Sequence, residues 1–189
     1  MNPTEHTVNT QHTWTTQRVG DILPVEFYNL IEKNRTHIRK TFPITTSTCI
    51  DEQTTADFLK LFVEREESNE NYFLFMRDNA TKELIGFACV KNITPDLAEC
   101  ELAYFADKDC EGRGIITGAV ADLLVLCFGE LKMNKVYICT PTTNIASQKV
   151  ALKNGFKHEG ILRDEFRNGD GEFEDVVYFG LLKEDYNER

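Results

Sequence analysis

The sequence lacks the basic surplus that nucleic-acid binding requires. Its 189 residues include 21 Lys and Arg against 31 Asp and Glu, which gives a formal net charge of −10. Phosphate backbones are bound by a basic face, so this balance argues against a nucleic-acid interface. An acidic surface suits a cationic partner such as an amine or a basic peptide, although it also serves solubility alone.

Long apolar runs and paired metal-ligand motifs are also missing. No stretch approaches the roughly 20 apolar residues that span a membrane, and the N-terminal MNPTEHTVNTQHTWTTQ has no apolar signal-peptide core. None of the six cysteines forms a CxxC pair and no histidine cluster accompanies them, so neither a zinc site nor a disulfide framework is indicated. We therefore expect a protein of the reducing cytoplasm without a metal or a membrane contact.

The chain also lacks internal repeats, low-complexity segments and Pro/Gly/Ser-rich linkers that would divide it. Its hydrophobic content of 41% is enough for one sizeable core. We expect residues 1–17 to form an N-terminal extension that is partly ordered, and residues 18–189 to form a single domain.

Apolar periodicity predicts an α/β fold. Helical spacing predicts helices over 24–34, 51–66, 115–131 and 144–154, the last closed by Gly155. Strand patterns predict strands over 72–76, 84–90, 99–106 and 136–139, and a final hairpin over 160–166 and 173–182 that turns at 168–171. Pro43 is expected to break the helical region before it. Together these elements predict a mostly antiparallel sheet with helices on both faces.

A glycine turn between a strand and a helix is the first candidate binding motif. The sequence CEGRGIIT runs from Cys110 to Thr117. A helix N-terminus has unpaired N–H groups and a positive dipole, and glycines let a phosphate approach the backbone closely. Arg113 adds a charged donor. A plain turn that uses glycine for positive φ explains the same residues, so the motif alone stays ambiguous.

The second motif runs from Pro141 to Phe156, PTTNIASQKVALKNGF. Asn144 is a good helix N-cap, and Ser147 follows one turn later. A capped amphipathic helix that ends in glycine explains most of these residues, but it does not explain the order of the two motifs together.

In that order, the two motifs resemble the GCN5-related N-acetyltransferase (GNAT) superfamily. The strings CEGRGIITGAVADLLVLCFGEL, KVYICTPTTNIASQKVALKNGFKHEGIL and EFEDVVYFGLL carry the resemblance, and NLIEKNRTHIRKTFP extends it to roughly residues 18–186. Within the superfamily, the chain most resembles the ribosomal-protein N-terminal acetyltransferases of the RimJ/RimL type. The resemblance implies a GNAT fold, in which the central sheet is splayed at two parallel strands.

The resemblance also implies acetyl-CoA as the co-substrate, held in that splay between the strands ending near Phe105 and Cys139. Its pyrophosphate would bind the backbone N–H groups of the glycine turn, and its pantetheine arm would follow the edge of the preceding strand. The residues implied for cofactor binding are Tyr104, Phe105, Ala106, Gly112, Arg113, Gly114, Ile115, Thr117, Asn144 and Ser147.

Acetyl transfer to an amine requires a base for the ammonium, donors for the carbonyl oxygen and a proton for the leaving thiolate. The resemblance offers Glu101 and Glu165 as candidate bases, and this choice stays open. Ser147 is the candidate acid, and a backbone N–H near Phe105 or Ala106 would serve the carbonyl oxygen.

Two departures from the superfamily pattern stand out. Asp109 occupies a position where the superfamily carries Gln or Arg, which places acid beside the proposed phosphate site. Ala151 occupies a position where many members carry a catalytic tyrosine. A non-catalytic acyl-CoA-binding module is therefore one alternative.

The acceptor is expected to be a protein N-terminal amine, as in the RimJ/RimL branch. A small amine, such as a polyamine or an antibiotic, is the alternative. Arg35 and His37 lie where relatives shape the acceptor pocket, so they are candidate substrate contacts. Relatives are commonly homodimers, and the apolar C-terminal hairpin, including residues 176–179, is a candidate interface or a part of the core.

Overall fold

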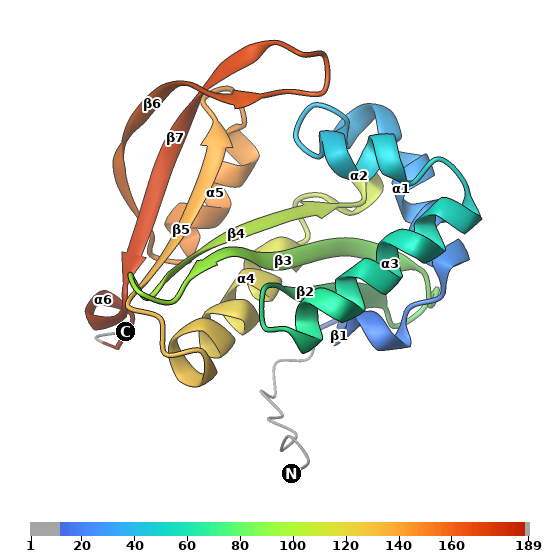
Figure 1. Cartoon of the computed structure of the whole chain (residues 1–189), viewed down its shortest axis with the longest axis horizontal. Helices are drawn as coiled ribbons and strands as arrows, with labels where there is room; N and C mark the ends of the chain where they lie inside the picture. The colour runs from blue at the N-terminus through green and yellow to red at the C-terminus, as the bar shows by residue number, and fades with distance from the viewer. Residues whose placement is uncertain (1–11, 188–189) are drawn as a thin grey trace.

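The computed structural model describes residues 12–187, which form a seven-stranded sheet with helices on both faces (Figure 1). Along the chain the elements are β1 (Trp14–Gln17), η1 (Val19–Asp21), α1 (Pro24–Ile38), α2 (Pro43–Thr48), α3 (Glu52–Glu67), β2 (Tyr72–Asp78), β3 (Leu84–Thr94), β4 (Glu99–Ala106), η2 (Lys108–Cys110), α4 (Ile115–Val125), η3 (Leu126–Glu130), β5 (Lys135–Pro141), α5 (Ile145–Lys153), β6 (Lys157–Arg167), β7 (Phe173–Leu182) and α6 (Lys183–Asn187). The strand order is β1-β2-β3-β4-β5-β7-β6, and among these strands of residues 12–187 only the β4–β5 pair is parallel. The expected mixed, mostly antiparallel sheet is confirmed.

Each face of the sheet has its own hydrophobic core. α4 and α5 cover one face, which we call the α4/α5 face, and its core includes Leu102, Ile138 and Phe179. α1 and α3 cover the other, which we call the α1/α3 face, where a phenylalanine cluster includes Phe27 and Phe105. Strand side chains alternate between faces, so β4 sends even-numbered residues to one core and odd-numbered residues to the other.

In the predicted hairpin, β7 belongs to the core, whereas β6 is mostly exposed. Val176, Val177 and Phe179 of β7 are 2%, 5% and 3% exposed. They therefore fill the protein interior and are not available as an interface. The turn at 168–171 has the expected form, because Gly171 N–H donates to Asn168 O over 2.9 Å.

The structure differs from the sequence-based expectation near Pro43 and near the N-terminus. Pro43 does not end the helical region but begins α2, as suits a residue whose missing N–H costs nothing in a first turn. Trp14–Gln17, within the expected extension, pairs with β2 as an edge strand. The rest of that extension, residues 1–11, lies outside the described residues. The apolar helix over 115–131 is α4 followed by one π-helical turn, η3.

Candidate functional site

The two parallel strands at the centre of the sheet separate after a short stretch of pairing. β4 and β5 pair at Glu99–Lys135, Cys100–Val136 and Glu101–Tyr137, and no pair joins them beyond that point. Figure 1 shows the strands diverging from there. Their facing edges therefore offer backbone donors and acceptors to an extended ligand that lies between them.

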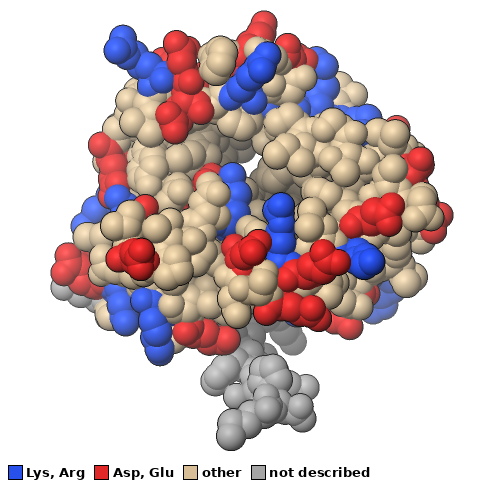
Figure 2. All heavy atoms as spheres, viewed as in Figure 1, with Lys and Arg blue, Asp and Glu red and all other residues tan. Residues whose placement is uncertain are grey.

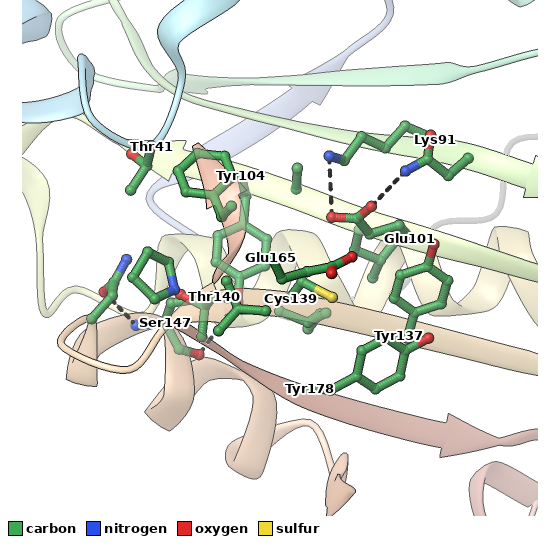
Figure 3. Close-up of a pocket in the computed structure, with 18 of the residues that line it drawn as sticks. Thr41, Lys91, Glu101, Tyr104, Tyr137, Cys139, Thr140, Ser147, Glu165 and Tyr178 are labelled. Atoms are coloured by element: carbon green, nitrogen blue, oxygen red, sulfur yellow. Dashed lines mark hydrogen bonds and ion pairs between the residues drawn. The ribbon is translucent and has the colours of Figure 1, made fainter. Parts of the chain in front are cut away.

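A cavity of about 300 Å³ occupies this splay. Its walls come from the α1–α2 linker, from five strands and from α5. The space-filling surface, seen from the same side as in Figure 1, is hollowed at its centre (Figure 2). Five residues singled out from the sequence line it: Glu101, Tyr104, Asn144, Ser147 and Glu165. All of them except Asn144 are labelled in Figure 3. The cavity thus brings the three candidate catalytic residues together, while their roles stay predictions.

The cavity passes through the sheet, since its lining comes from both faces. Tyr104 packs on the core of the α4/α5 face, and Ser147 of α5 lies beside it. Ala103 packs on the core of the α1/α3 face, and strand alternation puts Glu101 on that same face. A group bound in the splay would therefore meet a carboxylate on one side and a hydroxyl on the other.

Glu101 is buried and fully engaged. The residue is 8% exposed. Its Oε1 lies 3.1 Å from Lys91 Nζ, and its Oε2 accepts a hydrogen bond from Asn92 Nδ2 at 2.7 Å. Both oxygens of the carboxylate thus already have donors. Each oxygen keeps a second lone pair, but the two donors hold the Glu101 carboxylate against β3.

Glu165, in contrast to Glu101, has a carboxylate without hydrogen-bond donors among residues 12–187. It lies where β6 departs from regular pairing with β7, between Leu162 and Phe166, and its side chain points into the cavity (Figure 3). No hydrogen bond or ion pair joins its carboxylate to any other residue within 12–187. Its oxygens are therefore free to accept a proton.

The Cys139 thiol shares the cavity with the Glu101 and Glu165 carboxylates. Burial, together with the Glu101 and Glu165 carboxylates, raises the pKa of Cys139 to about 12, while Lys91 opposes the shift. The thiol therefore stays protonated in the cavity and is a poor nucleophile.

Ser147 is held at the start of α5 by two neighbours. Asn144 caps the helix as expected, and its Oδ1 accepts from Ser147 N–H at 3.1 Å. Ser147 Oγ lies 3.0 Å from the Tyr104 hydroxyl. Burial raises the pKa of Tyr104 to about 12, although the hydrogen bond with Ser147 opposes the shift. No sequence pattern indicates this pair, whose members lie 43 residues apart.

The glycine turn has the geometry of an anion site, although none of its residues lines the cavity. Gly112 and Gly114 have φ of +74° and +79°, and a Cβ added at either would meet no atom within 4 Å. α4 starts at Ile115, and Gly118 N–H makes the helix's first bond, to Gly114 O. The preceding N–H groups of the turn lack helical partners. Thr117 O accepts from Asn154 Nδ2 at 3.2 Å, which ties α4 to the end of α5.

The acids beside this turn are paired with side chains of α1. Lys33 Nζ lies 2.6 Å from Asp107 Oδ2 and 2.9 Å from Asp109 Oδ2. These bonds raise the pKa of Lys33, and the Lys33 ammonium lowers the pKa of Asp109. His37 Nε2 lies 2.8 Å from Glu111 Oε1. Lys33 and His37 are four residues apart on one helix, a spacing that could have indicated a shared face.

Three predicted contact residues have other partners. Arg113 binds Asp78 Oδ2 of β2 at 3.2 Å, and this bond raises its pKa. Arg35 donates to the carbonyls of Thr46 and Cys49 at the end of α2, so it braces that helix. Neither Arg35 nor His37 lines the cavity.

Phe105 and Ala106 continue the edge of β4 beyond its pairing with β5. The Phe105 side chain packs into the phenylalanine cluster, and Ala106 pairs with Gly86 of β3. Their side of the strand that faces the splay is unpaired by β5. Near the base of the splay, the Tyr137 and Tyr178 rings stack at 4.8 Å, a feature that sequence reasoning missed.

Neither a membrane helix nor a metal cluster is found within residues 12–187. None of the helices there is both long and apolar enough to cross a bilayer. No group of three or more His, Cys, Asp or Glu side chains in that range is arranged to hold a metal ion.

Comparison with known proteins gives a consistent result. The family model "Acetyltransferase (GNAT) domain" matches residues 21–157. The chain is 36% identical over 103 residues to YdaF of Bacillus subtilis, whose name assigns it to the ribosomal N-acetyltransferases; this match covers 54% of the chain and 56% of YdaF. It is 28% identical over 142 residues to the ribosomal-protein-serine acetyltransferase of Escherichia coli, with 75% of the chain and 78% of that protein covered. The chain thus spans little more than half of YdaF in that match.

Solved structures share the fold. The ribosomal-protein-S5-alanine acetyltransferase of Vibrio fischeri superposes with a TM-score of 0.84 at 20% identity, covering 94% of this chain and 97% of that one. RimL, a ribosomal L7/L12 alpha-N-protein acetyltransferase in complex with coenzyme A, gives 0.81 at 16% identity, with 90% and 94% covered. A spermidine N-acetyltransferase chimera of SpeG from Vibrio cholerae gives 0.71 at 21% identity, with 94% and 100% covered.

Proposed function

The chain belongs to the GNAT acetyltransferase family, and from this premise we propose that it transfers the acetyl group of acetyl-CoA to a protein N-terminal α-amine. The observation that carries the proposal is the cavity through the splayed sheet. Glu101, Glu165 and Ser147 line this cavity. The reaction needs a proton acceptor for the amine, for which Glu165 is suited, and a proton donor for the sulfur, for which Ser147 is suited.

Acetyl-CoA would lie along the splay as an added strand. We propose that the N–H groups of Gly112, Arg113, Gly114 and Ile115 bind its pyrophosphate, which the positive φ angles and the open space above the glycines support. The edge of β4 at residues 104–106 would pair with the pantetheine arm. Asn144, the cap of α5, and Ser147 would lie at the acetyl end. A CoA-bound RimL with the same fold supports this placement.

We assign the base to Glu165, because its carboxylate is free while that of Glu101 is held by two donors. The ammonium gives a proton to Glu165, and the freed nitrogen forms a bond to the thioester carbon. The C–S bond then breaks with its electron pair on sulfur, and Ser147 O–H gives its proton to that sulfur. The nitrogen loses its second proton as the amide forms; this proton restores the Ser147 hydroxyl, and the proton held by Glu165 is released. The amide, the CoA thiol and one released proton are the products. A backbone N–H at Phe105 or Ala106 would hold the carbonyl oxygen.

The charges in the cavity favour an acceptor with one positive group. Lys91 and Glu101 neutralise each other, so Glu165 is the one cavity carboxylate without a hydrogen bond or ion pair to another residue within 12–187. A polyamine carries several ammonium groups, and this single carboxylate can pair with only one of them. Names of relatives as ribosomal-protein acetyltransferases support a protein N-terminus as the acceptor.

We also propose that the protein forms a homodimer and resides in the cytoplasm. Homodimerisation would use the outer edge of β6, which pairs with no strand among residues 12–187 and exposes Ile161. All six cysteines are free thiols, which supports a reducing cytoplasm. Arg35 and His37 stay predictions as acceptor contacts, although both lie outside the cavity.

The test of the proposed function is release of CoA thiol from acetyl-CoA by the purified protein with two acceptors in parallel, a serine-starting peptide and spermidine. We expect turnover with the peptide, and a loss of about 100-fold or more in Ser147→Ala with CoA binding retained. Turnover with spermidine alone would assign a small amine instead. CoA binding without any turnover would assign a non-catalytic module.

A further inference from the structure

Tyr104 contacts the group proposed to face the leaving sulfur, yet the proposed reaction gives its hydroxyl no task. It lies on β4 opposite Ala88 of β3, and strand alternation turns its ring toward α5. Its hydroxyl lies 3.0 Å from Ser147 Oγ and 3.3 Å from the Ser147 carbonyl oxygen (Figure 3). It also lines the cavity.

We propose that Tyr104 is a positioning residue for the acetyl transfer: its hydroxyl donates to Ser147 Oγ and leaves the Ser147 proton free to point at the leaving sulfur. This inference rests on the proposed function, because it assigns a task within that same site. It goes beyond the backbone role implied for the strand at residue 104, since it depends on the side chain alone.

The Tyr104 hydroxyl has one proton and two acceptors within reach, and we assign its proton to Ser147 Oγ at 3.0 Å, the shorter contact, over the Ser147 carbonyl oxygen at 3.3 Å. A phenol is more acidic than an aliphatic alcohol and is the better donor, whereas the serine oxygen has two lone pairs to accept with. Burial keeps the phenol protonated throughout the neutral range, because the pKa of Tyr104 is raised to about 12. The same shift makes full transfer of its proton to a thiolate unfavourable, so Tyr104 acts as a donor that keeps its proton.

Without this donor, Ser147 would have a competing use for its proton. A serine in the first turn of a helix readily turns its hydroxyl toward a nearby backbone carbonyl. α5 offers no substitute, since Gln148 binds Thr142 O at 2.9 Å and Ala151, one turn beyond Ser147, has no hydroxyl. Tyr104 therefore fixes the orientation of Ser147 from outside the helix.

The first test compares Tyr104→Phe, Ser147→Ala and the double variant in the acetyl-transfer assay. We expect Tyr104→Phe to lower kcat about tenfold or more with the KM for acetyl-CoA unchanged. The double variant should fall no further than Ser147→Ala, because the two groups act as one unit. Tyr72→Phe is the matched control, since it removes a strand tyrosine hydroxyl that bonds Asn69 at 2.8 Å outside the cavity.

The second test needs no acetyl transfer. The thiol pKa of bound CoA is read from thiolate absorbance, with the complex of desulfo-CoA as the blank. An oriented Ser147 donor should lower this pKa in the wild type, and both Tyr104→Phe and Ser147→Ala should return it toward the value of free CoA.

The two readouts separate the possible failures. A Tyr104→Phe variant with wild-type kcat and an unchanged thiol pKa would overturn the positioning role while leaving the proposed function intact. The positioning role would be supported if the thiol pKa of bound CoA is lowered in the wild type and returns toward that of free CoA in Tyr104→Phe. If the wild type at the same time acetylates no acceptor, the proposed transfer would be overturned. Failure of the wild type to bind CoA would overturn both.

Discussion

At the scale of single residues, the glycine turn and the cavity depend on different properties. Gly112 and Gly114 matter for their backbone angles, because open space surrounds them and the φ values lie in the left-handed region. Glu101 and Glu165 have the same side chain, but their partners differ. The role of a glutamate in this cavity therefore depends on its hydrogen-bond partners as well as on its side chain.

Gly114→Ala tests the turn. A side chain at φ of +79° costs about 1–2 kcal/mol, and it also puts a methyl group where the pyrophosphate would approach. We expect CoA to bind about tenfold more weakly or worse, measured by titration calorimetry. Gly129→Ala is the control, because its Cβ also meets nothing within 4 Å and its φ is not positive. Unchanged affinity in Gly114→Ala would remove the turn from the cofactor site.

Glu165→Gln and Glu101→Gln test the choice of base. We expect Glu165→Gln to lower kcat by about 100-fold or more, because it removes the free proton acceptor. Glu101→Gln should lower kcat less, since it mainly leaves Lys91 without its partner. The readout is kcat under saturating acetyl-CoA. The reverse order of the two losses would assign the base to Glu101.

Single residues also show where sequence reasoning stopped. The N-cap at Asn144, the αL glycine at Gly155 and the hairpin turn could be predicted, because each is a local choice of backbone conformation. Lys33 could not be assigned to Asp107 and Asp109, which lie more than 70 residues away in the chain. Such ion pairs depend on how α1 docks, which no local pattern encodes.

At the scale of elements, the β6–β7 hairpin tip is clasped to the α1–α2 linker. Gly169 N–H donates to Lys40 O at 3.2 Å, and Asp170 binds Arg39 at 2.7 Å and Lys40 at 3.3 Å. Thr41 and Phe42, the next residues of that linker, line the cavity together with Phe166 of the hairpin. The clasp thus holds two walls of the cavity at a fixed separation.

Gly169→Ala tests the clasp. An added Cβ would lie 2.0 Å from Arg39 O, so the tip or the linker must move. We expect a loss of about 1–3 kcal/mol in unfolding free energy and a higher KM for the peptide acceptor, with the affinity for CoA retained. Gly160→Ala, on β6 of the same hairpin and with nothing within 4 Å of an added Cβ, is the control. An unchanged KM in Gly169→Ala would separate the clasp from acceptor binding.

Elements with a clear period could be predicted from the sequence, and those defined by distant partners could not. β4 and β7 have the predicted bounds, because each is a largely apolar run bounded by turn-forming residues. α2 is a six-residue helix braced by Arg35, too short for a period to appear. The splay itself depends on the register of β4 against β5, and only the family resemblance indicated it.

At the scale of the whole molecule, the sheet separates two cores and the cavity crosses between them. This arrangement places Glu101 and Ser147 on opposite faces although both line one cavity. An amine and a thioester can therefore meet from opposite sides. The net charge of −10 is a property of the surface and says little about the cavity, where Lys91 pairs with Glu101.

Acid stability follows from carboxyls whose pKa is lowered by folding. Hydrogen bonds from Arg77, Thr54, Thr81 and Lys33 lower the pKa of Glu26, Asp51, Asp78 and Asp109, respectively. A carboxyl with a lowered folded pKa contributes stability above its unfolded pKa of about 4, and this is lost as pH falls through the folded value. We expect Tm to be level from neutral pH to about pH 5 and to fall below that.

Glu26→Gln should weaken the fall of Tm in acid, because it removes one of the linked groups that bind Arg77. Glu64→Gln is the control, since its side chain makes no hydrogen bond or ion pair within residues 12–187. Thermal unfolding followed by circular dichroism across the acid range gives both curves. Identical slopes for Glu26→Gln and the wild type would contradict the linkage.

The central claim is that the cavity delivers acetyl from CoA to the α-amine of a protein chain. The most direct measurement is the mass-spectrometric position of acetyl on a peptide that carries both a free N-terminus and an internal lysine, after incubation with acetyl-CoA and the wild type or Glu165→Gln. The account predicts one acetyl group, on the α-amine, formed by the wild type and strongly reduced in Glu165→Gln. Acetylation of the lysine alone, or equal products from both proteins, would contradict it.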